Sequence, residues 1–275
     1  MTRAGSALAL AVHALLLAGA AATLAPLLWM ISVSLMPAEA SLRLPPPLLP
    51  ERISLEHYRT LLTELDLGRY LVNSSLLAGA VTVLSLVING LAGYAFAKLR
   101  FAGRERIFRL LLAAMAIPGQ VAMLPLFLLL KQLGLINSYG GVIVPGMASI
   151  FGIFLVRQYA LSIPDSLLEA ARIDGAGEFR IFRSVVLPLL SPILVTLALV
   201  TFLGVWNDFL WPLIVLFDDR RYTLPVALAN LLGEHAQDTE LMMAGAVVTL
   251  VPVMVLFLAL QRYYIEGLIL GSVKE

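Results

Sequence analysis

The sequence predicts an all-α integral membrane protein with six transmembrane helices. Its 275 residues are 60% hydrophobic and only 13% charged, whereas a soluble domain is usually about 45–50% apolar and about 25% charged. A core of this size cannot bury so much apolar surface, so lipid must be the solvent for a large part of it.

Six apolar stretches are long enough to cross a bilayer, whose hydrocarbon core of about 30 Å takes about 20 helical residues. We expect a single transmembrane domain over 1–275, with outer loops at about 36–72 and 217–240. The expected spans lie at about 8–35, 75–97, 110–130, 139–156, 188–211 and 241–261.

The first span has no charged residue between Arg3 and Glu39. Arg3, the apolar run and AGAAA at 18–22 also resemble a secretory signal peptide. The apolar run, however, continues through Ile31, well beyond the core of such a signal. We therefore expect an uncleaved first helix.

The first outer loop and the later spans contain structure-breaking residues. LPPPLLP at 44–50 should be extended, because proline fixes φ, and Ser54 should cap a short helix that continues to about residue 70. Spans three to six contain Pro118, Pro145, Pro192 and Pro252. A broken backbone hydrogen bond is tolerated in lipid where neighbouring helices or a water-filled cavity satisfy it.

The distribution of lysine and arginine indicates the orientation of the chain, because short cytoplasmic segments are enriched in both. Twelve of the 19 basic residues fall on the side of the termini, five of them in the connector 98–109. The other side has seven, and its loops are net acidic. This pattern predicts that both termini and the segment 162–187 face the cytoplasm.

Several kinds of site are disfavoured by residue content. The chain has no cysteine and only three histidines, which are far apart, so we expect neither a metal site nor a catalytic residue. Its net charge of +1 is not gathered on one face, which gives no sign of nucleic-acid binding. The phosphate-binding pattern GxxxxGK[ST] is absent, so we expect no bound nucleotide or other cofactor.

The segment 162–187 is unusually polar for this chain and is expected to form a helix–turn–helix between spans four and five. Ser162 and Pro164 are typical of a helix start, and Gly175 is typical of a helix end. Ala170 and Ala171 would let another surface approach the backbone closely. From the residues alone, a solvated connector and a docking surface both remain open.

The spacing of this segment resembles a known motif. Glu169-Ala170-Ala171 is followed by Gly175 and, ten residues later, by Val185, with Leu187-Pro188 two residues beyond it. This pattern is similar to the EAA motif of the inner-membrane permeases of ABC importers. The family often has isoleucine in place of Val185, a difference that changes no expectation.

The resemblance extends over nearly the whole chain. It points to carbohydrate importers, and within them to the second permease, the one similar to the maltose-transporter G subunit. The segments that carry it are YLVNSSL at 70–76, AGYAFAKLRFAGR at 92–104, WNDFLWP at 206–212, YTLPVAL at 222–228 and GLILGSVKE at 267–275.

This resemblance implies a type I ABC importer permease fold in a bacterial or archaeal cytoplasmic membrane. The implied partners are a second, paralogous permease, two copies of a cytoplasmic ATPase that binds ATP and magnesium, and an extracytoplasmic solute-binding protein. The residues implied to contact or align the ATPase are Glu169, Ala170, Ala171, Asp174, Gly175, Leu187 and Pro188.

A second group of residues is a candidate solute path. Carboxylates are rare in apolar spans and tend to face a cavity or a partner, and Asp208 lies near the end of span five with aromatic and amide neighbours that suit a sugar. A helix terminus with interfacial tryptophans explains the same residues equally well. The candidates are Trp206, Asn207, Asp208, Trp211, Asn89 and Gln120.

Two alternatives concern function. The same role for glycerol phosphate or a polyol would be favoured by a basic residue within a span, and none occurs in mid-span. A stand-alone, ion-coupled secondary transporter would be expected to have inverted repeats with charged residues at mid-membrane; no clear repeat is found. A membrane enzyme is disfavoured because no nucleophile, base and metal set converges.

Overall fold

The computed structural model describes residues 3–38, 40, 47–234 and 238–272, and within these ranges the chain is helical, with no β-strand. Lys274 and parts of the quoted segments 44–50 and 267–275 lie outside the described residues. The contacts cluster into two compact units, Met1–Gly68 with Leu228–Pro252 and Arg69–Ala227 with Val253–Glu275, and the single transmembrane domain stays a prediction. Each unit is described by itself.

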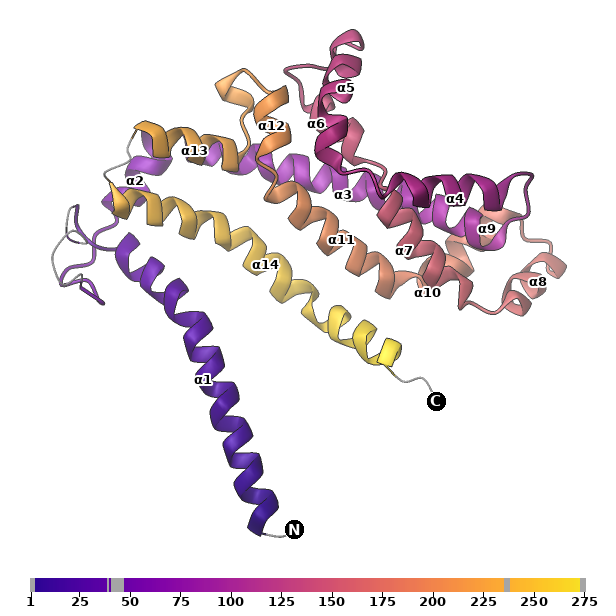
Figure 1. Ribbon diagram of the computed structural model, residues 1–275, viewed down its shortest axis with the longest axis horizontal. Helices are drawn as coiled ribbons and strands as arrows, with labels where there is room; N and C mark the ends of the chain where they lie inside the picture. Colours follow the sequence, from indigo (N-terminus) through magenta and orange to yellow (C-terminus); the bar gives the residue numbers. More distant parts are fainter. Residues whose placement is uncertain (1–2, 39, 41–46, 235–237, 273–275) are drawn as a thin grey trace. The chain divides into compact units, whose positions relative to one another are not determined.

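The first unit contains two helices and parts of two others, shown in Figure 1. They are α1 (Arg3–Ser34), α2 (Glu56–Thr63), the end of α13 (Leu224–Glu234) and the first part of α14 (Thr239–Ser272). Within the apolar stretch Ala9–Ser34 of α1, only Ser32, Val33 and Ser34 at its end are buried within the chain, and the most apolar 18-residue window has no buried residue. Its surface is therefore left for lipid or another subunit to cover.

Helix α2 is shorter than the sequence predicted. The N-cap residue is Leu55 rather than the predicted Ser54, and no side chain caps the helix. Ser54 accepts a hydrogen bond from the Glu56 amide at 3.3 Å, and the helix ends at Thr63 rather than near residue 70. The reason is Asp66, whose φ of 55° is left-handed and separates α2 from α3. His57 Nε2 donates a hydrogen bond to the Met36 carbonyl at 3.1 Å and holds α2 against the end of α1.

The second unit contains most of the helices. They are α3 (Leu67–Lys98), assigned here from Arg69, α4 (Arg104–Ala114), α5 (Gly119–Gln132), α6 (Tyr139–Gly146), α7 (Ile150–Leu161), α8 (Asp165–Ile173), α9 (Glu178–Ile181), α10 (Leu187–Leu189), α11 (Ser191–Trp206) and α12 (Leu210–Val215). A π-helical turn, Phe182–Val186, joins α9 to α10, and a 3₁₀ turn, Asp219–Arg221, follows α12.

Four stretches among the described residues are long and apolar enough to cross a membrane, and there are six if each of two bent pairs is one span. The four are Ala9–Ser34, Leu67–Lys98, Tyr139–Leu161 and Thr239–Ala259. The bent pairs are Arg104–Ala114 with Gly119–Gln132, at 105°, and Glu178–Leu189 with Ser191–Trp206, at 78°. The protein is thus a multi-pass membrane protein, and the count of six stays a prediction.

The bends fall where the sequence predicted continuous spans. The expected span 110–130 is broken before α5 at Pro118, which has an extended backbone with ψ of 133°. The expected span 188–211 is broken twice, near Pro192 and again between α11 and α12. Proline removes a backbone donor and disfavours helical geometry in the residue before it, so these breaks follow the residues that interrupt the helical ladder.

Helix α3 is the central element of the second unit. Near its start, Asn73 donates hydrogen bonds to the carbonyls of Arg220 and Tyr222 at 2.9 and 3.0 Å, and Ser74 accepts one from the Leu224 amide at 2.7 Å. Near its other end, α3 lies against α7 at Gly93, where a Cβ atom would come within 2.6 Å of Val156 Cβ. Only glycine permits this close approach.

We predict that Gly93→Ala destabilises the protein by about 1–3 kcal/mol, because the added methyl group must displace packed atoms of α7. The measurement is the midpoint of thermal unfolding of the purified protein in detergent. The control is Gly79→Ala on the same helix, where an added Cβ meets no atom within 4 Å. Equal midpoints for the two variants would contradict the close contact between α3 and α7.

Candidate docking surface

The segment 162–187 folds as a helical hairpin at the end of α7. Helix α8 ends in a Schellman motif: the Ala176 amide donates to the Ala171 carbonyl at 3.0 Å, and the Gly175 amide to the Arg172 carbonyl at 3.0 Å. Gly175 has the left-handed φ of 78° that this motif requires. The start of α8 differs from expectation, since Pro164 is the N-cap residue and Ser162 donates to the Tyr159 carbonyl instead.

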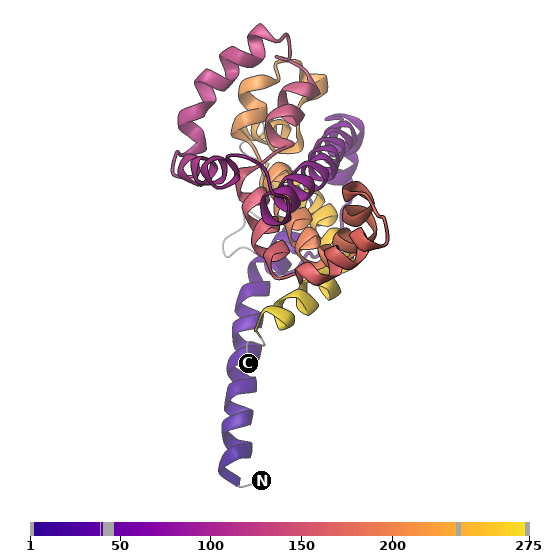
Figure 2. The ribbon, with the colours of Figure 1, turned by 90° about the vertical axis from the view of Figure 1, so that its right-hand side faces the viewer.

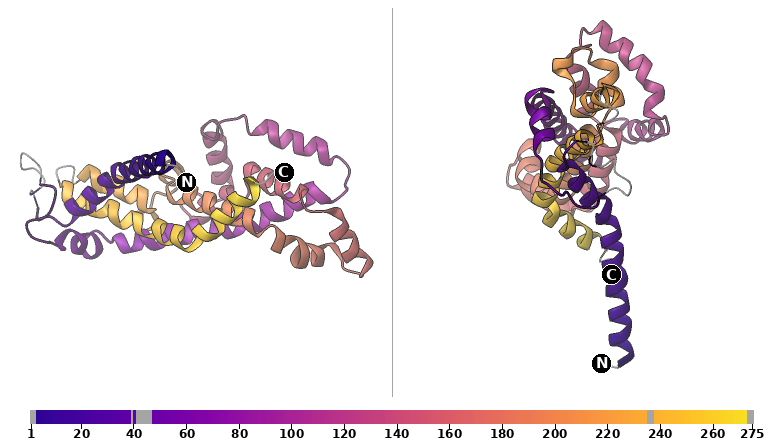
Figure 3. Two further views of the ribbon diagram at one scale, coloured as in Figure 1. Left: turned by 90° about the horizontal axis from the view of Figure 1, so that it is seen from below. Right: turned by 90° about the vertical axis from the view of Figure 1, so that its left-hand side faces the viewer.

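One side of the hairpin is exposed. The predicted contact residues Glu169, Ala170, Asp174 and Gly175 all lie on this side, with Ala171 half-buried. Figure 2 views this end of the unit face on, and the left view of Figure 3 shows α8 and α9 beyond the end of α7. Two large apolar side chains accompany them, Ile173 at 87% exposure and Phe179 at 72%. Sequence reasoning missed these two, although their position beside the Gly175 turn could have identified them.

The opposite side of the hairpin is packed into a buried cluster. Leu168, Ile181 and Phe182 are at most 8% exposed and pack with side chains of α3, α7 and α11. Leu187 and Pro188 lie at the junction with α11, where both are exposed while the flanking Val186 and Leu190 are fully buried. The buried Val186 and Leu190 therefore hold this junction more than the exposed Leu187 and Pro188 do.

A polar network ties both halves of the hairpin to α3. Tyr94 of α3 donates a hydrogen bond from its hydroxyl to Glu178 Oε2 at 2.8 Å. Arg172 of α8 donates to Glu178 Oε1, also at 2.8 Å. Glu178 thus bridges α8, α9 and α3 across the Gly175 turn.

A second tie lies one helical turn further along α3. Lys98 donates to the Ile163 carbonyl at 2.6 Å and to Asp165 Oδ1 at 2.7 Å. The Lys98 side chain is only 6% exposed, and a buried ammonium needs such partners. Its hydrogen bond and charge lower the pKa of the exposed Asp165 carboxyl, which keeps this pair ionised at lower pH than usual.

The residues that form these hydrogen bonds, except Tyr94 and Ile163, line a hollow of about 740 Å³. Its lining combines the basic end of α3 with the acids of α8 and α9, and includes Lys98, Arg100, Asp165, Glu169, Arg172 and Glu178. Among the described residues, no group of three or more histidine, aspartate or glutamate side chains could hold a metal ion.

The candidate path residues are only partly brought together. Asp208 accepts a hydrogen bond from the Trp211 amide at 3.3 Å, at the start of α12. Trp211 is 7% exposed and donates its indole hydrogen to the Gly141 carbonyl at 3.0 Å. Trp206 is 1% exposed and stacks on Phe202. Neither tryptophan therefore offers a free aromatic face, whereas Asn207 is exposed beside them.

The other two path candidates lie in different surroundings. Asn89 is fully buried; its amide donates to Ser85 at 2.7 Å and its carbonyl oxygen accepts from the Ser149 amide at 3.1 Å. The carbonyl oxygen thus joins α3 to the start of α7, while the amide is bonded within α3. Gln120 is exposed in the first turn of α5.

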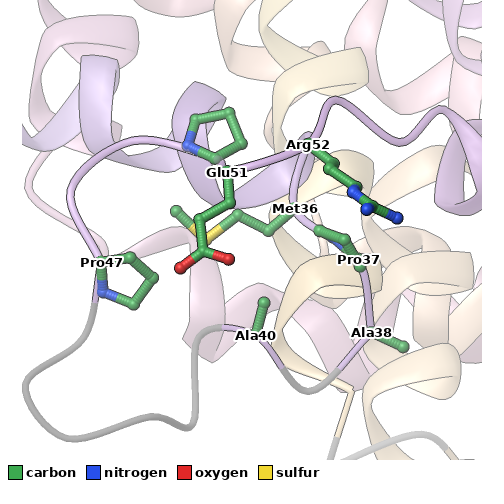
Figure 4. A pocket seen from close by; sticks show the side chains of 8 residues that line it. Met36, Pro37, Ala38, Ala40, Pro47, Glu51 and Arg52 are labelled. Atoms are coloured by element: carbon green, nitrogen blue, oxygen red, sulfur yellow. The ribbon is translucent and has the colours of Figure 1, made fainter.

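The first unit contains a separate hollow of about 450 Å³, shown in Figure 4. It is lined by Met36, Pro37, Ala38, Ala40, Pro47, Pro50, Glu51 and Arg52. In Figure 4 the carboxylate of Glu51 points into this hollow, and the guanidinium of Arg52 points away from it.

Comparison with known proteins connects this geometry to a family. Residues 89–269 match the family described as binding-protein-dependent transport system inner membrane component. The chain is 40% identical over 252 residues, 90% of each chain, to the arabinooligosaccharides transport system permease protein AraQ of Halalkalibacterium halodurans. It is 32% identical over 265 residues, 94% of each chain, to the sn-glycerol-3-phosphate transport system permease protein UgpE of Salmonella typhi.

A solved structure is similar over almost the full length. It is a chain in the crystal structure of a bacterial ABC transporter involved in the import of the acidic polysaccharide alginate. The TM-score is 0.84 at 26% sequence identity, and the match covers 96% of this chain and 99% of that one. The hairpin, residues 162–187, lies inside the region that matches the family.

We predict that Tyr94→Phe loosens the hairpin locally, since loss of a hydrogen bond to a charged group costs about 1–2 kcal/mol at a partly exposed site. The measurement is amide hydrogen exchange, which should become faster in α8 and α9 and stay unchanged in α5. The control is Tyr159→Phe, because Tyr159 packs on the same buried cluster and its hydroxyl has no hydrogen-bond partner among the described residues. Unchanged exchange in Tyr94→Phe would show that the bond to Glu178 does not hold the hairpin.

Proposed function

The chain belongs to the family of binding-protein-dependent transport system inner membrane components, and from this membership we propose that it is the permease subunit of an ATP-driven carbohydrate importer. In this role it forms half of a translocation path and receives its energy from an ATPase through the segment 162–187. The observation that carries the proposal is the hairpin itself, which has one side packed on three helices and the motif residues, with Ile173 and Phe179, on the other.

The exposed side has the chemistry of a protein docking site. Ala170 and Gly175 bring the backbone close to the surface, and Glu169 and Asp174 add negative charge. Ile173 and Phe179 are large apolar side chains of the kind found at the cores of protein interfaces. We assign Glu169, Ala170, Ala171, Asp174 and Gly175 to contact with the ATPase, and Leu187 and Pro188 to the junction that passes motion to α11.

In this proposal, other chains bind the nucleotide and hydrolyse it. Two ATPase subunits would bind ATP and magnesium, and their ATP-driven closure would turn the permease pair from the inward-facing to the outward-facing state. A second permease would form the other half of the path, and a solute-binding protein would deliver solute from the outer side. The hairpin and both termini then face the cytoplasm, as the lysine and arginine distribution predicts.

A carbohydrate is the favoured solute. AraQ belongs to a system for arabinooligosaccharides, and this chain is 40% identical to it over 252 residues, 90% of each chain. UgpE supports the alternative of glycerol 3-phosphate at lower identity. A phosphorylated solute needs a cation along its path, and lysine and arginine are absent from the described middle of α3, α7 and α11 apart from Arg157, which is occupied by Glu105 and the Phe96 carbonyl.

Among the path candidates, Asn207 and Asp208 at the break between α11 and α12 are the most suitable for a sugar hydroxyl. Asn207 donates to the Leu203 carbonyl and Asp208 Oδ1 accepts from the Trp211 amide, but Asn207 is exposed and Asp208 partly exposed, whereas Asn89 and Trp211 are buried. Trp206 is buried and would need a movement that exposes it, whereas Gln120 is already exposed on α5.

We predict that Glu169→Lys and Gly175→Pro each reduce import at least about tenfold in proteoliposomes that contain the complete complex. A reversed charge at a docked interface costs several kcal/mol, and proline does not tolerate the positive φ of Gly175. Glu56→Lys, on the exposed side of α2, is the matched charge-reversal control and should import normally.

Three outcomes would test the docking role, the energy source and the solute class separately. Normal import by both hairpin variants would contradict the docking role while leaving family membership intact. Import driven by an ion gradient without ATP would instead favour the stand-alone secondary transporter. The solute class is tested by the ATP hydrolysis that a carbohydrate-loaded binding protein stimulates, and stimulation only by glycerol 3-phosphate would replace the carbohydrate with the alternative.

A further inference from the structure

A hollow lined mainly by arginines lies at the connection between α3 and α4. Its volume is about 640 Å³, which is within the range of small-ligand sites. It is lined by Arg100, Phe101, Gly103, Arg104, Glu105, Arg106 and Arg109. Neither the proposed ATPase contact nor the solute path uses this hollow.

The positive charge of the hollow exceeds what its one acid neutralises. Glu105 is shared by Arg104 at 3.1 Å and Arg157 at 3.4 Å. Arg106 has no partner among the described residues, and Arg109 donates only to the Glu105 carbonyl of its own helix. Arg100 is attracted by the Asp165 charge, but Asp165 is bound by Lys98. Three exposed guanidinium groups therefore lack a counterion in direct contact.

The walls of the hollow are fixed in place. Phe96 packs against Phe101 and Phe108, with ring centroids 5.7 and 5.6 Å apart, and Arg157 lies over the Phe108 ring at 4.0 Å. Arg104 donates to the Leu99 carbonyl at 3.0 Å. These contacts hold the Arg104 side chain and the Phe101 ring, so this part of the wall is in place before an anion binds.

Apolar side chains lie on the helix surface beside the charges. Phe101 is 41% exposed, Ile107 45% and Leu110 71%. Helix α4 is also the first half of a bent pair of helices that together are long and apolar enough for one span, and its charged residues precede the apolar residues 110–114. A ligand here would meet guanidinium groups at one end and apolar side chains further along α4.

We propose that this hollow binds the phosphate of an anionic membrane phospholipid, with the acyl chains along Ile107 and Leu110. Arginine binds phosphate oxygens in a bidentate manner, and basic pockets at the ends of membrane helices bind anionic headgroups. A soluble anion would use the guanidinium groups but would leave the exposed apolar side chains uncovered. The proposal does not depend on which solute is transported.

The test uses the complete complex reconstituted in phosphatidylcholine with and without phosphatidylglycerol. Native mass spectrometry counts the phosphatidylglycerol molecules that remain bound after extraction into detergent. Arg106→Gln with Arg109→Gln should weaken this retention about tenfold to thirtyfold. The control is Arg52→Gln with Arg59→Gln, two exposed arginines of the first unit, which removes the same charge and should leave the retention unchanged.

Further arms separate the possible outcomes. Arg106→Lys with Arg109→Lys keeps the charge and should retain an intermediate amount of lipid, which distinguishes lost binding from misfolding. Equal retention in the glutamine and control variants would overturn the proposal. Displacement of the bound phosphatidylglycerol by inorganic phosphate, without any effect of Leu110→Ser, would also overturn it in favour of a site for soluble anions.

Discussion

The close contact between α3 and α7 determines where the rest of the second unit lies. Because Gly93 has no side chain, α7 approaches α3 until Val156 would touch a Cβ atom at 2.6 Å. This approach brings Tyr94 and Lys98, which are four residues apart on α3, within reach of the chain that leaves α7. Lys98 then binds the Ile163 carbonyl and Asp165, and Tyr94 binds Glu178. The hairpin is thus attached to a long helix at both of its halves.

We propose that this attachment gives the hairpin a mechanical role. A force applied at its exposed side, near Ile173 and Phe179, passes through the buried side chains Leu168 and Phe182 and through the ties to α3. A solvated connector would not need a packed side, and it would not expose two large apolar side chains beside a left-handed glycine. In this proposal, ATP hydrolysis on the partner ATPase drives transport, and this chain transmits the resulting movement to the membrane helices.

The sequence was informative where local rules decide the structure. The Gly175 helix end, the apolar character of the spans and the family were predictable, because cap residues, hydrophobic length and motif spacing act over short distances. Tertiary contacts were not predictable: Lys98, Tyr94 and Glu178 are ordinary polar residues until α3, α8 and α9 meet. The same holds for Asn89, a candidate path residue in sequence that is a buried link between helices. The helix break at Asp66 was also missed, because a non-glycine residue with positive φ has little sequence signal.

The central claim is that the exposed side of the hairpin contacts an ATPase in the cytoplasm, and a single cysteine tests it most directly. The chain has no cysteine of its own, so Ala170→Cys is a unique reactive site in this subunit. The measurement is thiol cross-linking in intact cells, with an Asp219→Cys variant for comparison on the exposed 3₁₀ turn after α12. We predict that Ala170→Cys joins this chain to the ATPase and is protected from a membrane-impermeant thiol reagent, whereas Asp219→Cys reacts with that reagent. Labelling of Ala170→Cys from outside the cell, with no cross-link to the ATPase, would contradict the account.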